Sequence, residues 1–450
     1  MNLLILGGGP AGYTAAERAA RAGLNVTLFE KHSLGGVCLG EGCIPTKTLL
    51  QSAKIYDHAR EARKYAVNVS EVTYDLPRMI ARKQKVVRKL ALGIQAKLQA
   101  AGVTVVMGEG EVVDAQHVAC GGQTYEADYL LLCTGSEAVV PPITGLDTVP
   151  YWTHREALAM KALPASLAII GGGVIGMEFA SLFTSLGTKV TVVERLPEIL
   201  GGLDGEVSAL LRAEYAKRGV RFLLGASVVG VKPASVSGEG IQVDYVDPAG
   251  VRSSVTAQQL LVSTGRRPVL AGLETLDLAC DARGRLVVDA QMRTSLPTVF
   301  ACGDLTGRSM LAHTAVREAE VAVNTILGQP DEMSYRAIPS VVYTNPEAAS
   351  VGATEEELKR MGTSYHALRL PMTYSGRFVA ENEGMNGLCK LLLADDQTLL
   401  GAHLLGNPAS EIIAMAGMAI DLGLTARQWG RTVLPHPSVG EIFKEAISHL

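Results

Sequence analysis

The sequence predicts an α/β protein built from two copies of one βαβ unit, followed by a separate α+β region. Three observations support this fold class. An apolar strand, a glycine-rich turn, a helix and a second strand begin near the N-terminus and recur in the middle of the chain. The two copies match in register, because Gly7 and Glu30 return 164 positions later as Gly171 and Glu194. After about residue 333 the chain lacks such turns and carries short apolar strands and one helical pattern.

The length and composition fit a globular protein of several domains. The chain has 450 residues, which suggests about three domains at roughly 150 residues each. Hydrophobic residues make up 48%, charged residues 19%, and the formal net charge is −4. This balance indicates no basic patch for nucleic acid and no polybasic anchor for a membrane. The most apolar long stretch, 163–183, is interrupted by glycines, and no signal peptide is evident, so we expect a cytoplasmic protein.

Each βαβ unit has the spacing Gly-x-Gly-x-x-Gly between its first strand and its helix. These glycines are Gly7, Gly9 and Gly12 in the first unit and Gly171, Gly173 and Gly176 in the second. The first glycine permits a tight turn, the second lets the backbone approach a pyrophosphate, and the third lets helix and strand pack closely. The pyrophosphate then lies on the N–H groups at the helix N-terminus. The two copies therefore predict two bound dinucleotides.

The acid that closes the second strand of each unit, Glu30 or Glu194, can accept hydrogen bonds from ribose hydroxyls. Glu194 favours NAD over NADP, because a carboxylate repels the 2′-phosphate. Arg195 beside it keeps NADP open, since an arginine can accept that phosphate.

Further strand ends mark where the chain leaves each unit. Short apolar strands at 129–135 and 260–265 end in Thr-Gly, at Gly135 and Gly265, and proline-containing segments follow both. A third strand, 298–302, is followed by Gly-Asp. We therefore expect four segments, which are a first nucleotide-binding part over 1–142, a second nucleotide-binding domain over 143–265, a return to the first over 266–333 and a C-terminal domain over 334–450.

Two of the seven cysteines share a glycine-rich segment directly after the first unit. Cys38 and Cys43 are five positions apart, unlike the Cys-x-x-Cys of thioredoxin-like or zinc sites, and no second ligand pair lies nearby. Two buried core thiols are the alternative, but four glycines within 35–42 argue against a core helix. A helix that begins at Pro45, with Lys47 in its first turn, would favour the thiolate of Cys43. We therefore expect redox function and no metal.

The segment 35–47 resembles the active-site motif of one enzyme family. Its pattern is Gly-Gly-x-Cys-x-x-x-x-Cys-Ile-Pro-Thr-Lys. This is similar to the two-dinucleotide-fold disulfide reductases, the pyridine nucleotide-disulfide oxidoreductases, which include dihydrolipoamide dehydrogenase, glutathione reductase, mercuric reductase and trypanothione reductase. The resemblance covers essentially the whole chain. It implies two Rossmann-like domains, for FAD and NAD, and a C-terminal α+β dimerisation domain.

The resemblance also implies which residues hold each cofactor. The residues implied for FAD are Gly7, Gly9, Gly12, Glu30, Lys47, Gly135, Asp304 and Ala312. The residues implied for NAD are Gly171, Gly173, Gly176, Glu194 and Gly265. Asp304 matches the aspartate that contacts the ribityl and phosphate region of the flavin.

Four of the residues implied in catalysis surround the flavin in such proteins. Cys43 matches the thiol next to the flavin, and Cys38 matches the interchange thiol that reacts with the substrate. Lys47 and Glu178 match an ion pair near the flavin N5 atom. As bare sequence, either of these charged residues would be read as a surface charge.

A histidine and a glutamate near the C-terminus complete the implied site. His436 and Glu441 resemble the family's His-Pro-x-x-x-Glu, in which the histidine is the acid–base and the glutamate orients it. Such a pair suits proton transfer, since imidazole titrates near neutral pH and a carboxylate fixes its tautomer. In this family the histidine serves the active site of the partner subunit, so the resemblance implies a homodimer.

Within the family, the resemblance is greatest to dihydrolipoamide dehydrogenase. The segment 310–313 resembles that enzyme more than glutathione reductase, and Val174 is aliphatic where glutathione reductases carry a tyrosine. Thr46 and Gly440 depart from the commoner residues of the two motifs without removing a chemical group. The resemblance implies oxidation of protein-bound dihydrolipoamide, with the lipoyl-bearing component of a 2-oxo-acid dehydrogenase or glycine cleavage complex as partner.

Three alternatives stay open. The protein could use NAD(P)H to reduce a different disulfide or a metal ion. It could be a flavin transhydrogenase or oxidase without disulfide chemistry, although the intact Cys38 and Cys43 argue against this. It could also serve mainly as the docking subunit of a 2-oxo-acid dehydrogenase complex.

Overall fold

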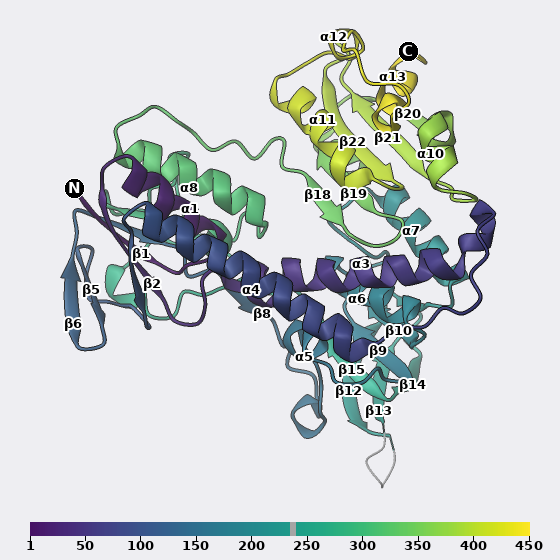
Figure 1. The fold of residues 1–450 in the computed structure, drawn as a ribbon, viewed down its shortest axis with the longest axis horizontal. Helices are drawn as coiled ribbons and strands as arrows, with labels where there is room; N and C mark the ends of the chain where they lie inside the picture. Colours follow the sequence, from purple (N-terminus) through teal and green to yellow (C-terminus); the bar gives the residue numbers. More distant parts are fainter. Residues whose placement is uncertain (235–239) are drawn as a thin grey trace. The chain divides into compact units, whose positions relative to one another are not determined.

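The computed structural model describes residues 1–234 and 240–450 (Figure 1). The chain divides into two units. The first unit comprises Met1–Thr48, Pro77–Val139 and Gly265–Ser334. The second unit comprises Leu49–Leu76, Val140–Thr264 and Tyr335–Leu450.

The first unit is built on a five-stranded parallel sheet with strand order β17-β7-β1-β2-β3. Its strands are β1 (Asn2–Leu6), β2 (Asn25–Glu30), β3 (Thr104–Met107), β7 (Tyr129–Leu132) and β17 (Val299–Ala301). The central strand β1 is a continuous apolar run with Leu3 and Ile5 fully buried. Parallel strands that are covered on both faces show such runs in place of alternation.

Helices α1 (Pro10–Arg21) and α8 (Ala312–Ile326) lie side by side in this unit (Figure 1). The alanines of α1 that face the core are small, which lets α8 approach closely, and Arg18 donates hydrogen bonds to Asn324. Two small antiparallel pieces complete the unit, a three-stranded sheet and a two-stranded ribbon. They are formed by β4 (Glu111–Val112), β5 (His117–Cys120) and β6 (Gln123–Glu126), and by β8 (Ser136–Ala138) and β16 (Arg266–Pro268).

The second unit contains its own parallel sheet, with strand order β11-β10-β9-β15. The elements around it are β9 (Ser166–Ile170), α6 (Val174–Ser185), β10 (Lys189–Glu194), α7 (Gly205–Lys217), β11 (Arg221–Leu224) and β15 (Gln259–Val262). An antiparallel sheet of β12 (Ser227–Pro233), β13 (Ile241–Val246) and β14 (Arg252–Ala257) follows α7 in the chain. The recurrence of the βαβ unit is therefore confirmed as two parallel sheets.

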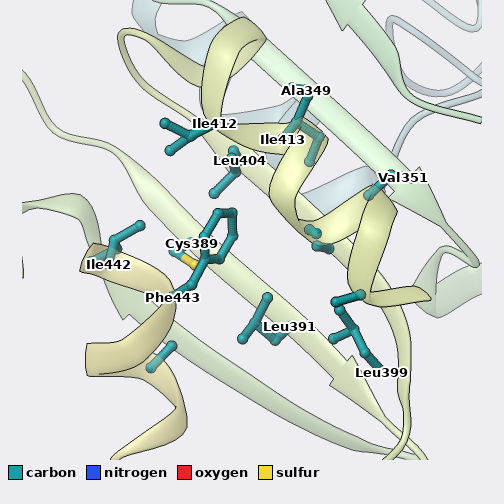
Figure 2. Close-up of a cluster of buried hydrophobic side chains, with 14 of the residues drawn as sticks. Ala349, Val351, Cys389, Leu391, Leu399, Leu404, Ile412, Ile413, Ile442 and Phe443 are labelled. Carbon is teal, nitrogen blue, oxygen red and sulfur yellow. The ribbon is translucent and has the colours of Figure 1, made fainter. Parts of the chain in front are cut away.

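The C-terminal part of the second unit is a five-stranded antiparallel sheet with strand order β18-β19-β22-β21-β20. The strands are β18 (Ser340–Val342), β19 (Ala348–Gly352), β20 (His366–Pro371), β21 (Leu388–Leu393) and β22 (Leu399–Leu405). Helices α11 (Ala409–Asp421) and α13 (Ile442–Ile447) pack against it. Figure 2 shows Leu391, Leu404 and Phe443 in the buried cluster that joins these helices to the sheet. The predicted α+β character of this region is confirmed.

Two long helices, α3 (Cys43–Arg60) and α4 (Leu76–Ala100), follow the first βαβ unit; a helix beginning near the start of α3 was predicted, whereas α4 was not. The buried face of α4 is sparse, because along its length only Leu76, Met79, Lys83 and Leu98 are buried. Its cations lie mostly on the exposed side, so the helix is amphipathic. Among the described residues, no helix is long and apolar enough to cross a membrane.

Candidate active site

The first glycine-rich turn connects β1 to α1. Gly7 has φ +98°, and a Cβ there would overlap the carbonyl oxygen of Cys133. A Cβ at Gly12 would overlap the carbonyl oxygen of Gly7, so the helix packs against its own turn as the fingerprint requires. At Gly9 an added Cβ would have only the Cα of Gly36 near it, at 4.0 Å. The turn therefore leaves room for a pyrophosphate at the N-terminus of α1.

The second turn, between β9 and α6, repeats this geometry. A Cβ at Gly171 would overlap the carbonyl oxygen of Ser263, and one at Gly176 would overlap that of Gly171. Gly173 has no atom within 4 Å of the position its Cβ would take. Gly9 and Gly173 are the N-caps of their helices with identical backbone angles, φ −71° and ψ −173°. Both turns can thus hold the diphosphate of a dinucleotide.

The two acids are held by backbone groups at the ends of β2 and β10. Glu30 accepts hydrogen bonds from the N–H of Gly8 at 2.8 Å and of His32 at 2.7 Å. Glu194 accepts them from the N–H of Gly172 at 2.6 Å and of Leu196 at 2.7 Å. Glu30 Oε1 also accepts the N–H of Ser33 at 3.2 Å, so Glu30 Oε2 and both oxygens of Glu194 keep a further lone pair for a ribose hydroxyl. The residues present therefore fit one dinucleotide at each turn.

Cys38 and Cys43 form a disulfide, with 4.6 Å between their Cα atoms. Cys38 lies in the short helix α2 (Gly36–Glu41), and Cys43 is the first residue of α3. It is the only disulfide among the residues that the structure describes. The position of Cys43 at a helix N-terminus stabilises a thiolate after reduction, since the N–H groups there carry positive partial charge.

The disulfide segment packs directly on the first glycine-rich turn. The N–H of Gly35 donates to the carbonyl oxygen of Gly8 at 2.8 Å. A Cβ at Gly36 would lie 2.8 Å from the Cα of Gly9, so only glycine permits this approach. The redox disulfide is therefore anchored to the same turn that fits a dinucleotide.

Two expectations about this segment were wrong. The helix begins at Cys43 and not at Pro45, which occupies the third position, where its missing N–H has no intrahelical role. Lys47 therefore lies in the second turn of α3. The glycine-rich stretch also forms the short helix α2, in which Gly35 is the left-handed N-cap and only Gly36 and Gly40 lie within the helix.

Asp304 lies in the 3-10 turn η4 (Gly303–Thr306), directly after β17. Its Oδ2 accepts a hydrogen bond from the Ser136 hydroxyl at 2.5 Å, and that hydroxyl accepts one from Arg266 Nε at 2.8 Å. The buried Glu318 accepts the N–H of Gly303 at 2.6 Å. Ser136, Arg266 and Glu318 were missed, because no sequence pattern connects residues up to 168 positions apart.

The remaining cofactor candidates lie at strand and helix ends. Gly135 and Gly265 follow β7 and β15, and a Cβ at either would meet no atom within 4 Å. Ala312 is the first residue of α8, so its N–H belongs to a turn without intrahelical partners. The glycines after the two strands and the first residue of α8 therefore leave space or backbone N–H groups for a ligand.

Glu178 is buried on α6 in the second unit, where its Oε1 accepts the N–H of Tyr343 at 3.1 Å. This hydrogen bond orients the carboxylate from the C-terminal sheet. Lys47 belongs to the first unit. The ion pair of Lys47 with Glu178 stays a prediction.

His436 and Glu441 are brought together as the motif predicts. His436 Nδ1 donates to Glu441 Oε1 at 3.0 Å, and the N–H of Ser438 donates to Oε2 at 2.7 Å. The hydrogen bond from Ser438, followed by that from His436, holds the pKa of Glu441 below its usual value. The imidazole is 84% exposed in the single chain, and its Nε2 is left for proton transfer.

Three of the other cysteines are buried thiols that do not compete for redox chemistry. Burial, followed by the nearby Glu318 charge, raises the pKa of Cys133, and burial also raises those of Cys302 and Cys389. Such buried thiols stay protonated, and only a thiolate is nucleophilic.

Comparison with known proteins agrees with this site. Residues 1–319 match the family Pyridine nucleotide-disulphide oxidoreductase, and residues 338–447 match the dimerisation domain of the same family. The chain belongs to this family. It is 37% identical to the dihydrolipoyl dehydrogenase of Geobacillus stearothermophilus, over 98% of this chain and 94% of that protein. It is 36% identical to that of Mycoplasma pneumoniae, over 99% of this chain and 97% of that protein.

Two solved structures of the family are also similar. LpdA from Mycobacterium tuberculosis superimposes with a TM-score of 0.90 at 28% identity, over 100% of this chain and 99% of that chain. The HOCl-induced flavoprotein disulfide reductase RclA from Escherichia coli gives 0.87 at 28% identity, with the same coverage. The fold class is therefore confirmed, with FAD and NAD domains and an antiparallel C-terminal dimerisation domain.

Family membership defines the chemistry in general terms. The protein is a flavoprotein disulfide oxidoreductase whose redox disulfide is Cys38–Cys43. The family binds FAD and a pyridine nucleotide, and the matched dimerisation domain supports a homodimer.

Proposed function

We propose that the protein is a dihydrolipoyl dehydrogenase that oxidises protein-bound dihydrolipoamide to lipoamide with NAD⁺. The observation that carries this proposal is the full-length similarity, at 35–37% identity, to dihydrolipoyl dehydrogenases from bacteria, an archaeon and eukaryotes. The disulfide anchored on the first glycine-rich turn supplies the site for dithiol exchange.

The exchange follows from the chemistry of the residues. One substrate thiol gives its proton to His436 of the partner subunit and attacks the Cys38 sulfur, which breaks the Cys38–Cys43 bond and releases the Cys43 thiolate. The second substrate sulfur then attacks the mixed disulfide and releases Cys38 as a thiol. The substrate leaves as a cyclic disulfide, and two electrons and two protons have passed to the protein. FAD, when bound, supplies the hydride chemistry that connects these electrons to the nicotinamide.

The cofactor assignments belong to the same proposal. FAD would be held by the turn at Gly7, Gly9 and Gly12, with Glu30 and Asp304, and Lys47 and Glu178 would flank its reactive ring. NAD would be held by the second turn. Glu194 favours NAD, since its carboxylate lies buried at the end of β10, where it would face the 2′ position of the ribose.

A second candidate function is the reduction of a metal ion by NAD(P)H. RclA, which superimposes on this chain, has been solved as a complex with Cu(II). Among the described residues of this chain, no group of three or more His, Cys, Asp or Glu side chains is arranged to hold a metal ion.

Turnover assays under nitrogen separate these functions. We expect NADH formation from free dihydrolipoamide and NAD⁺ to be faster than NADH oxidation with glutathione disulfide or with Cu(II). Cys43→Ser should abolish the dithiol reaction. A colourless purified protein would contradict the flavin assignment, and faster turnover with Cu(II) would favour metal reduction. Copurification with a lipoyl-bearing component of a 2-oxo-acid dehydrogenase or glycine cleavage complex would identify the partner.

A further inference from the structure

Helix α4 has an extreme charge composition in a chain whose net charge is −4. It carries seven cations and no acidic residue between Leu76 and Ala100. The cations are Arg78, Arg82, Lys83, Lys85, Arg88, Lys89 and Lys97. Whole-chain composition did not predict this basic patch, because acids elsewhere offset it.

Most of these cations lie on one exposed face. Arg78, Arg82, Lys85 and Lys89 are spaced by four, three and four residues, so they form one stripe, and Arg88 lies beside it. We call these five residues the α4 stripe. All five are exposed, whereas Lys83 is buried.

The α4 stripe is locally unfavourable. Like charges three and four residues apart on a helix repel each other, and cations near a helix N-terminus oppose the helix dipole. Among the described residues, Lys85, Arg88 and Lys89 have no ion-pair partner that would offset this repulsion. Repulsion among these cations destabilises the helix, and the part of the chain that the structure describes shows no contact that compensates for it. Unfavourable features of this kind are expected at functional surfaces. The natural partner of such a surface is negatively charged.

The surroundings of the stripe favour an acidic protein over a nucleic acid. Helix α4 contains no aromatic residue on which a base could stack. Leu92 continues the stripe one turn beyond Lys89 and is 58% exposed, and Leu90 beside it is 42% exposed. Exposed apolar residues bordered by polar and charged residues are typical of a protein interface. The dimerisation domain match covers 338–447, so α4 lies outside the region that defines the homodimer.

The stripe begins beside the redox disulfide. Arg82 Nη1 donates to the carbonyl oxygen of Thr48 at 3.0 Å. Thr48 lies on α3 five residues after Cys43, which is about 7.5 Å along the helix at 1.5 Å per residue. A protein bound along the stripe would therefore have its edge near the disulfide segment.

We propose that the α4 stripe is the docking surface for an acidic protein that carries the dithiol substrate. The inference rests on the proposed function, since it names the partner that brings the dithiol to Cys38 and Cys43. Docking on the stripe raises the local concentration of the carried dithiol and does not change the chemistry of exchange.

The test compares two synthetic peptides that carry dihydrolipoyl-lysine, one flanked by glutamates and one flanked by glutamines. The stripe variant combines Lys85→Glu, Arg88→Glu and Lys89→Glu. The matched control combines Lys161→Glu, Lys189→Glu and Arg221→Glu, three exposed cations outside α4 that have no ion pair among the described residues. Both variants change the net charge equally. A difference in kcat/KM between them is therefore due to the α4 stripe and not to the electrostatic field of the whole protein.

We expect the stripe variant to lower kcat/KM for the glutamate peptide about tenfold at low ionic strength. Salt should remove this difference. The glutamine peptide and free dihydrolipoamide should react alike with wild type, stripe variant and control. An equal loss with the control variant, or with the glutamine peptide, would overturn the proposal.

Binding of the oxidised glutamate peptide, measured by fluorescence anisotropy, tests docking independently of turnover. If free dihydrolipoamide is not oxidised, the proposed function fails, and stripe-dependent binding still decides the docking surface. If an oligouridylate displaces the glutamate peptide at lower concentration than the unlabelled peptide itself, the surface binds nucleic acid and the proposal is wrong. If analytical ultracentrifugation shows that the stripe variant alone loses the dimer, the occupant is a second copy of the chain.

Discussion

At the scale of single residues, a substitution at the second glycine of each turn should weaken ligand binding without destabilising the fold. Gly173 has an extended backbone that any residue can adopt, and an added methyl group would meet no protein atom. We therefore expect Gly173→Ala to keep the unfolding temperature of wild type. Its methyl group would occupy the space left for the pyrophosphate. The KM for NAD⁺ should rise about tenfold, equivalent to about 1.4 kcal/mol of binding free energy.

The third glycine provides the contrast. In Gly176→Ala the methyl group would overlap the carbonyl oxygen of Gly171, so the helix must move away from its strand. This variant should lower both the unfolding temperature and the affinity for NAD⁺. Wild-type NAD⁺ kinetics in Gly173→Ala would contradict the placement of the nucleotide on this turn.

A buried histidine predicts how stability depends on acid. His403 Nε2 donates to the carbonyl oxygen of Ala353 at 3.1 Å, and the Ser350 hydroxyl donates to Nδ1 at 3.0 Å. Burial lowers the pKa of His403, and the opposing charges of Asp204 and Glu356 only partly offset it, with Lys390 acting in the same direction as burial. The folded protein thus holds the neutral ring.

Because the folded protein holds His403 neutral, the unfolded chain binds one more proton in mild acid. In the unfolded chain this histidine takes up a proton below about pH 6.5, whereas the folded ring does not until a lower pH. Stability is therefore lost progressively as pH falls below about 6.5. We expect His403→Gln, which keeps a donor and an acceptor, to flatten this part of the curve of unfolding free energy against pH. An unchanged slope would mean that other groups govern the acid response.

At the scale of elements, one buried lysine connects strand β21 to the start of helix α7. Lys390 is 1% exposed, and its Nζ lies 2.8 Å from Asp204 Oδ2 and 2.5 Å from Glu355 Oε2. Asp204 also caps α7 by accepting the N–H of Glu206. Partial burial of Glu355 is outweighed by hydrogen bonds from Lys390, Tyr365 and Lys359, which hold its pKa well below the usual range.

Removing this cation leaves buried carboxylates without compensation. Lys390→Met should destabilise the protein by about 3–5 kcal/mol, as is typical when one partner of a buried pair is lost. Lys359 pairs with the same Glu355 but is 62% exposed, so Lys359→Met should cost about 0–1 kcal/mol. Urea unfolding of the two variants gives the comparison. Equal losses would show that burial does not distinguish the two lysines.

The contrast between predicted and missed elements has a physical basis. The two βαβ units were predicted because their glycines and acids lie within about 25 residues of one another and each has a local steric role. Helix α4 was missed, because no chemical motif marks it and its amphipathic pattern of apolar and cationic residues was overlooked. Lys390 was read as part of an apolar strand, since its carboxylate partners lie far away in sequence. Sequence patterns report local constraints, and pairings across the chain appear only in the structure.

The same limit applies to the site. Cys38, Cys43, His436 and Glu441 were predicted in the correct pairs, because each pair is separated by only five residues. The hydrogen bond between Ser136 and Asp304 joins residues 168 positions apart, and no sequence motif predicts it.

At the scale of the whole molecule, the exposed His436 and the matched dimerisation domain bear on how the site is completed. The family resemblance implies that His436 serves the disulfide of the partner subunit. If so, two inactive variants should restore each other in a mixed dimer. A dimer of one Cys43→Ser subunit and one His436→Gln subunit contains one site with both cysteines and a partner histidine.

The mixed-dimer experiment denatures the two variants together at equal concentration and refolds them with added FAD. Random pairing makes half of the dimers mixed, and each has one working site of two, so about a quarter of the wild-type activity should return. The activity of each variant refolded alone is the control. If His436 acts on the disulfide of its own chain, every subunit of the mixture lacks an essential group and no activity returns. Recovery therefore depends on the histidine crossing between subunits, because refolding alone repairs neither substitution.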